Sequence, residues 1–208
     1  MSPRLAASTL LTVTSLVLIT GCSAPSVTDG KERGAPAFDP FRAARTTEVA
    51  PSSQLYSAPK SAPTRVVVPA LGIDMPVEPH GVDGAGQMSL PENIFTAGWY
   101  ESGSSPNRAV GSTVIAAHVD SRVQGVGPFA ALRTATPGTE VTIADAAGDT
   151  HTYRVVSVVK LEKTTIDWSE YVTLTGEPEL ILVTCGGAFI EDVRNYTDNY
   201  IVTAEKVS

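Results

Sequence analysis

From Thr64 to the end of the chain, short runs of aliphatic and β-branched residues recur, separated by Gly, Pro, Asp or Asn. Alternation of apolar and polar residues within such runs is the period of a half-buried strand. A helical period is nearly absent and is limited to residues 128–132 and 168–171. We therefore predict an all-β barrel or sandwich with short helical turns. The expected strands are residues 65–69, 73–77, 112–117, 139–143, 151–161, 179–184 and 199–205, with a hairpin joining the fourth and fifth.

The N-terminus has the features of an export signal. The segment from Leu5 to Gly21 contains no charged residue and follows Arg4. Its length is at the short limit for crossing a bilayer and suits a secretory signal. An aliphatic residue and two small ones precede Cys22, which is the pattern of a lipoprotein signal, so the Cys22 thiol is the predicted lipidation site. Two acyl chains would hold firmly, since each buried CH2 contributes roughly 0.8 kcal/mol.

An uncleaved signal anchor is the alternative interpretation of residues 1–22. Both interpretations place the domain on the extracellular face of the cytoplasmic membrane, lipid- or helix-anchored. Residues 23–63 are rich in Pro, Ser, Thr and Ala and show no sustained hydrophobic period. Such a composition buries too little apolar surface to order itself, so we predict a disordered tether. Residues 64–208 remain as the folded domain.

The charge of the chain excludes one class of partner. The formal net charge is -7 and the isoelectric point is near 4.9. Most of the acidic residues lie after Thr64, in the predicted domain. Nucleic-acid binding needs a basic face that neutralises phosphates, so we predict no nucleic-acid partner.

Cys185 is the first candidate for chemistry. The chain contains only one other cysteine, Cys22, and a lipidated Cys22 would leave Cys185 as a free thiol. A lone cysteine is often a small buried apolar side chain, and this alternative stays open. However, Cys185 ends an apolar run and precedes Gly186 and Gly187. A nucleophile at a strand end beside glycines would let a substrate backbone approach closely. Such a nucleophile needs a nearby base or cation.

His118 is the best candidate partner for Cys185, because it also follows an apolar strand, residues 112–117. The other two histidines are interpreted as structural or solvated. His80 lies in a predicted turn and His151 lies at a hairpin edge.

Arg194 is the default candidate for a cation. It is the only Arg or Lys between Cys185 and the predicted last strand. An arginine could stabilise an oxyanion or fix a carbonyl through charge-assisted hydrogen bonds. The alternative is a surface arginine paired with Glu191 or Asp192.

Several motifs are missing from the sequence. There is no phosphate-binding glycine loop, no His-Glu-x-x-His zinc pattern and no Gly-x-Ser-x-Gly elbow. The three histidines are scattered and the cysteines do not cluster. We therefore predict no metal site and no cofactor.

Three segments resemble the sortases, and more narrowly the actinobacterial class F group: residues 112–121, 182–189 and 194–202. The resemblance covers about residues 65–204. Two features depart from the family. Ala117 stands where the family commonly has Gly before the histidine, and sortases more often carry a transmembrane anchor than a lipoprotein signal.

The resemblance implies an eight-stranded sortase-type β-barrel in which His118, Cys185 and Arg194 converge. It implies a cysteine transpeptidase of Gram-positive bacteria that cleaves a Leu-Pro-x-Thr-Gly sorting signal between Thr and Gly. Cys185 would form the thioacyl enzyme, His118 would transfer protons, and Arg194 would stabilise the oxyanion or position the peptide. The acyl group would pass to an amine acceptor, which attaches surface proteins to the cell wall. The implied partners are secreted proteins bearing the signal and a peptidoglycan precursor or pilin lysine.

Three other functions remain as alternatives. A cysteine hydrolase would use the same residues and pass the acyl group to water. An L,D-transpeptidase would need a Ser-His-Gly-Cys type motif, which the sequence lacks. A non-catalytic, membrane-tethered β-barrel binding module would not need a cysteine, a histidine and an arginine together.

Overall fold

The computed structural model describes residues 60–84 and 86–207. The predicted signal or anchor segment, and the predicted tether up to residue 59, lie outside the described residues. None of the helices formed by the described residues is both long and apolar enough to span a membrane. The strands are β1 (Pro63–Val68), β2 (Ile73–His80), β3 (Ala97–Tyr100), β4 (Ser112–Ala116), β5 (Asp120–Ser121), β6 (Gly125–Val126), β7 (Glu140–Asp145), β8 (Thr150–Glu162), β9 (Glu179–Ile190) and β10 (Asn195–Lys206).

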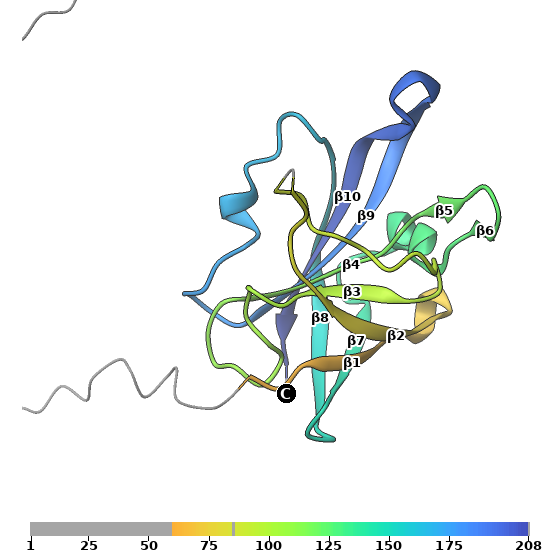
Figure 1. Cartoon of the computed structure of the whole chain (residues 1–208). Helices are drawn as coiled ribbons and strands as arrows, with labels where there is room; N and C mark the ends of the chain where they lie inside the picture. The colour runs from red at the N-terminus through yellow and green to blue at the C-terminus, as the bar shows by residue number, and fades with distance from the viewer. Residues whose placement is uncertain (1–59, 85, 208) are drawn as a thin grey trace, which may run out of the picture. The chain divides into compact units, whose positions relative to one another are not determined.

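Eight of these strands close into a barrel in the order β1-β2-β3-β4-β9-β10-β8-β7, and β5 and β6 form a small separate hairpin (Figure 1). The predicted all-β fold with an eight-stranded barrel is therefore confirmed. Short 3-10 helices complete the structure: η2 (Pro69–Leu71), η3 (Pro128–Thr134), η4 (Trp168–Glu170) and η5 (Glu191–Val193). η3 and η4 coincide with the two predicted helical turns.

β3 was not among the predicted strands, because it is short and contains a glycine. At Gly98 an added Cβ atom would lie 3.3 Å from side-chain atoms of His80, Leu90 and Pro91. Close packing over β3 therefore requires a glycine at residue 98. The segment is a strand because it pairs with β2 and β4.

Most neighbouring strands are antiparallel, but β2 pairs with β3, and β4 with β9, in parallel. β4 and β9 have buried side chains on each of their faces. Ile115, Leu180 and Leu182 point into the barrel core, whereas Val114 and Val183 belong to a second apolar cluster. This second cluster includes Val172 from the β8–β9 connection and Leu90 from the β2–β3 connection. Residues at the outer faces of β4 and β9 therefore lie under these two connections.

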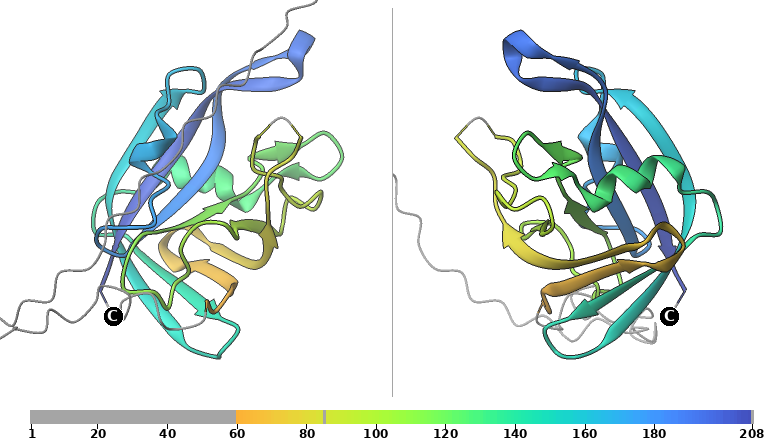
Figure 2. Two further views of the ribbon diagram at one scale, coloured as in Figure 1. Left: turned by 60° about the vertical axis from the view of Figure 1, so that its left-hand side comes forward. Right: turned by 90° about the vertical axis from the view of Figure 1, so that its right-hand side faces the viewer.

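β9 and β10 are longer than the sequence predicted and continue past the barrel as a projecting hairpin, shown in blue in Figures 1 and 2. The hairpin turn is η5. The predicted strands ended at residue 184 and began again at residue 199, because the intervening residues include two glycines and several exposed polar groups. A β-bulge between Tyr196 and Asp198 shifts the register where the hairpin leaves the barrel.

Candidate active site

The parallel pairing of β4 with β9 sets His118 beside Cys185. The register pairs Ala116 with Val183, so two further residues along each strand bring the histidine opposite the cysteine. Two hydrogen bonds extend the pairing past the end of β4. The backbone N–H of Ala117 donates to Val183 O at 3.1 Å, and Thr184 Oγ1 donates to Ala117 O at 2.9 Å. Adjacent strands lie about 4.8 Å apart, which brings the two candidate residues within reach of a common substrate atom.

His118 is half-buried, and burial lowers its pKa below the usual value for histidine. The nearby carboxylate of Asp120 acts in the opposite direction but does not cancel the effect. The imidazole is therefore mainly neutral near pH 7. A neutral imidazole at this position can accept a proton, and it becomes a proton donor once it has done so.

Tyr196 connects the projecting hairpin to the loop that carries His118. Its hydroxyl donates a hydrogen bond to Asp120 Oδ2 at 2.5 Å. This bond, together with partial burial and the negative charges of Asp120 and Cys185, raises the pKa of Tyr196 to about 12. The phenol therefore stays protonated and keeps Asp120 in place.

The hydrogen-bond partner of the Cys185 sulfur, among the residues that the structure describes, is Lys163. Lys163 Nζ lies 3.4 Å from Cys185 Sγ and donates a second hydrogen bond to Asn195 Oδ1 at 2.6 Å. Lys163 directly follows β8, and no motif in the sequence connects it with the cysteine. The contact arises because β10 pairs with β8 on one edge and with β9 on the other.

Arg194 lies in the turn of the projecting hairpin. It is exposed, it follows η5, and its backbone is left-handed with φ 49°. Extended strand from Cys185 to Ile190 spans roughly 17 Å, at about 3.3 Å per residue. The structure thus brings His118 and Cys185 together and holds Arg194 at the far end of the hairpin. The catalytic assignment of Arg194 stays a prediction.

The two acidic residues proposed as alternative partners of Arg194 do not pair with it in the described residues. Glu191 instead forms an ion pair with Arg122 at 2.8 Å, between two exposed side chains. This pair joins the β9–β10 turn to the β5–β6 hairpin.

Gly186 and Gly187 have packing reasons for lacking a side chain. At Gly186 an added Cβ atom would lie 2.5 Å from the ring of Tyr200. Gly187 has φ 77°, and a Cβ atom there would collide with Thr197 and Asp198. The glycines therefore permit the bulge through which the hairpin leaves the barrel just beyond the cysteine.

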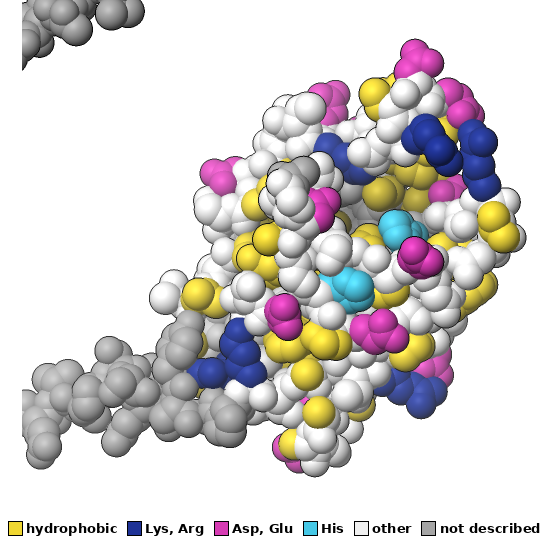
Figure 3. All heavy atoms as spheres, viewed as in Figure 1, with side chains coloured by type: hydrophobic (Ala, Val, Ile, Leu, Met, Phe, Trp, Pro, Cys, Tyr) yellow, Lys and Arg dark blue, Asp and Glu magenta, His cyan; other side chains and the backbone are white. Residues whose placement is uncertain are grey.

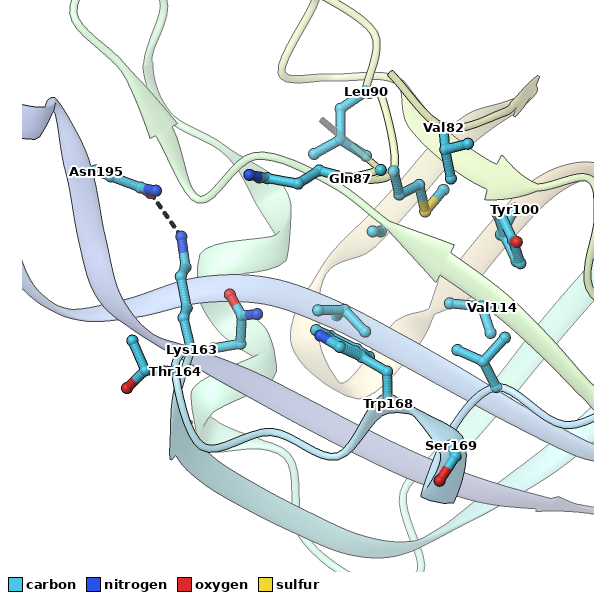
Figure 4. A pocket seen from close by; sticks show the side chains of 16 residues that line it. Val82, Gln87, Leu90, Tyr100, Val114, Lys163, Thr164, Trp168, Ser169 and Asn195 are labelled. Atoms are coloured by element: carbon cyan, nitrogen blue, oxygen red, sulfur yellow. Dashed lines mark hydrogen bonds between the residues drawn. The ribbon is translucent and has the colours of Figure 1, made fainter. Parts of the chain in front are cut away.

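An apolar groove with a volume of about 750 Å³ lies over β4 and β9, the strands that lead to His118 and Cys185. It lies under the two connections that cover β4 and β9, and Figure 3 shows hydrophobic side chains around a hollow on this face. In Figure 4, Val82, Gln87 and Leu90 lie on one side, Trp168 and Ser169 on the other, and Lys163 and Asn195 at one end. The floor includes Ala116 and Val183, which lie two residues before His118 and Cys185, and Asn199, which pairs with Cys185.

The other two histidines have hydrogen-bond partners of their own. His80 Nδ1 lies 3.1 Å from Ser89 Oγ. His151 is buried, and its Nε2 lies 2.9 Å from Asp145 Oδ2. Their structural interpretation agrees with these contacts. Among the described residues, no three His, Cys, Asp or Glu side chains form a group that could hold a metal ion.

Comparison with known proteins identifies the domain. The profile of the sortase domain family matches residues 66–207. A search of curated proteins finds no match. Among solved structures, the chain is similar to sortase C-1 from Streptococcus pneumoniae, with 20% identity and a TM-score of 0.55 over 70% of this chain and 66% of that one.

Two further structures show the same likeness. The Pilus Island 1 sortase C2 of Group B Streptococcus has 20% identity and a TM-score of 0.54, over 73% of this chain and 76% of that one. Sortase C1 from Streptococcus suis has 20% identity and a TM-score of 0.55, over 75% of this chain and 78% of that one. At these identities the likeness concerns the fold. The match spans just under two thirds of the pneumococcal chain.

Proposed function

The chain belongs to the sortase family, and from this premise we propose that it is a cysteine transpeptidase acting on a peptide sorting signal. The observation that carries the proposal is the parallel register that sets His118 beside Cys185, two residues beyond Ala116 and Val183 in the floor of an apolar groove. A nucleophile, a proton acceptor and an extended binding surface are the parts that acyl transfer needs.

In the first half-reaction, the Cys185 thiol gives its proton to the neutral His118 imidazole, and the sulfur attacks the carbonyl carbon of the scissile peptide bond. The resulting tetrahedral intermediate collapses, the C–N bond breaks, and the leaving amine takes a proton from the His118 imidazolium. The acyl group remains on sulfur as a thioester.

In the second half-reaction, an acceptor amine attacks the thioester carbonyl and His118 accepts a proton from it. A new amide forms, the C–S bond breaks, and the leaving Cys185 sulfur takes the proton back from His118. A thioester favours this route because it persists long enough in water for an amine to arrive.

The groove supports a substrate that enters as an extended segment with apolar side chains. Its lining is mainly apolar, including Met88, Leu90, Val114 and Val172. A signal of the Leu-Pro-x-Thr-Gly type fits this character, with Leu and Pro over the apolar floor and the Thr carbonyl at Cys185.

The finer parts of the proposal come from the sequence. The class F resemblance, the predicted tether and the predicted signal at Cys22 suggest an enzyme held on the extracellular face of the membrane. Its acyl donors would be secreted proteins bearing the signal. Its acceptor would be a wall precursor or a pilin lysine.

The test uses the full-length protein, a Leu-Pro-x-Thr-Gly peptide and a small amine, with the products identified by mass spectrometry. We expect a peptide cut after Thr and joined to the amine, and a transient acyl mass on Cys185. Water as the sole acceptor would instead indicate a hydrolase. No cleavage and no adduct over several signal variants would contradict the proposal and favour a binding module.

The Cys185→Ala variant is the sharpest control for the chemistry. Loss of a covalent nucleophile lowers turnover by more than about a thousandfold. Because Cys185 is only partly buried, the variant should fold like the parent in circular dichroism and thermal unfolding. An unchanged cleavage rate would refute the assignment of the nucleophile.

A further inference from the structure

The charged groups around Cys185 differ in whether they already have an ion-pair or hydrogen-bond partner. Asp198 lies 3.5 Å from Lys160 Nζ, and Asp120 accepts a tyrosine hydroxyl. Within residues 60–84 and 86–207, no carboxylate lies at ion-pair distance from Lys163. The charge of this ammonium group is therefore free to act on the sulfur that it contacts.

The backbone holds Lys163 in its place. Its N–H donates to Thr197 O at 3.0 Å, which continues the pairing of β8 with β10 beyond the end of β8. The side chain is anchored at its tip by Asn195 Oδ1, which also accepts the backbone N–H of Tyr196 at 2.9 Å. Figure 4 shows Lys163 extended toward Asn195 at the end of the groove. Lys163 is thus held by hydrogen bonds at both its backbone and the tip of its side chain.

The side chain of Lys163 places its positive charge 3.4 Å from the sulfur that acts as the nucleophile. When the sulfur attacks a carbonyl, the developing oxyanion lies on the carbon bonded to the sulfur. A lysine ammonium has three N–H donors, and the contacts with Asn195 and Cys185 use two of them. The third is left for the oxyanion.

We infer that Lys163 supplies the positive charge of this active site, both to the Cys185 sulfur before attack and to the oxyanion after it. The second part rests on the proposed function, since it requires an acyl substrate. Arg194, the cation that the sequence suggests, is exposed in the hairpin turn and makes no hydrogen bond or ion pair through its side chain among the described residues. In this inference Lys163 takes the role that the sequence suggested for Arg194. Its contact with Cys185 in β9 cannot be read from the order of residues.

The test measures the rate at which iodoacetamide alkylates Cys185 in the full-length protein at pH 7. Mass spectrometry of the peptide that contains Cys185 separates this reaction from modification of Cys22. Lys163→Met should slow alkylation by about tenfold or more, because the positive charge beside the reacting sulfur is lost. Lys163→Arg keeps the charge and should react at a rate closer to that of the parent than Lys163→Met does.

Lys160→Met and Arg194→Met are the comparison variants. Lys160 lies in β8, three residues before Lys163, and pairs with Asp198, so its loss should leave alkylation unchanged. Alkylation of Lys163→Met at the parental rate would overturn the inference, and so would a loss of reactivity in Arg194→Met alone. The alkylation assay uses no peptide. If Lys163→Met reacts slowly while the parent cleaves no peptide, the lysine acts on the sulfur and the transpeptidase proposal fails.

Discussion

Two histidines in this molecule follow or belong to strands of the same barrel, yet their surroundings differ. His151 is buried in the β7–β8 hairpin and its ring nitrogen contacts Asp145, which also accepts the backbone N–H groups of Ala147 and Asp149. His118 is half-buried at the end of β4, beside Cys185 and a groove. His151 thus has a buried ionisable partner and a structural role, whereas the ring of His118 has no hydrogen-bond partner among the described residues and, in the proposed function, transfers protons.

Replacement of each histidine by alanine should give the largest difference between the two regions, in the rate of acyl transfer. His118→Ala should lower acyl transfer by about a hundredfold to ten-thousandfold, the usual contribution of a general acid–base group. Its unfolding midpoint should stay close to that of the parent. The measurement is the initial transfer rate of folded protein with peptide and amine.

His151→Ala is the matched control for that experiment. It should keep the transfer rate of the folded protein but lose about 1–3 kcal/mol of unfolding free energy, because a buried carboxylate loses a partner. The reverse result, a stable but inactive His151→Ala protein, would break the comparison.

The same contrast applies to glycines with positive φ. Gly187 lies beside the active site and its missing side chain faces Thr197, whereas Gly176 has a similar φ and open space around it. Gly187→Ala should cost about 1–3 kcal/mol from backbone strain, with a further loss from the collision. Gly176→Ala bears the strain alone, so urea unfolding should show a smaller cost. Equal costs would show that the hairpin adapts to a methyl group at residue 187.

The smallest expected effect is on the pH dependence of stability. Burial lowers the pKa of His118, so the unfolded chain binds the proton more readily than the folded one. The stability that this group contributes is complete above its unfolded pKa of about 6.5 and declines as the pH falls through the folded pKa. Unfolding free energies at pH 7.5 and 5.5 should therefore fall less steeply in His118→Ala than in the parent. An equal fall in unfolding free energy between pH 7.5 and 5.5 in the two proteins would mean that burial does not disfavour the His118 imidazolium.

Much of the fold could be predicted because strand patterns are local. The alternation in residues 139–143 and the apolar run at 179–184 predicted two strands that the structure contains. β3 was missed because it is short and because Gly98, required by close packing, interrupts the alternation of apolar and polar residues. The length of β9 was also missed, since its outer part contains two glycines and its last four residues are exposed.

The sequence by itself determined the strand-rich domain and singled out His118 and Cys185 from their positions at the ends of apolar runs. Only the tertiary structure decided which groups meet. The parallel register of β4 and β9 set the histidine beside the cysteine. The pairing of β10 with both β8 and β9 brought Lys163 to the sulfur, while the hairpin held Arg194 away from it. The physical reason is that strand formation depends on neighbouring residues, whereas strand pairing joins residues far apart in the chain through hydrogen bonds and core packing.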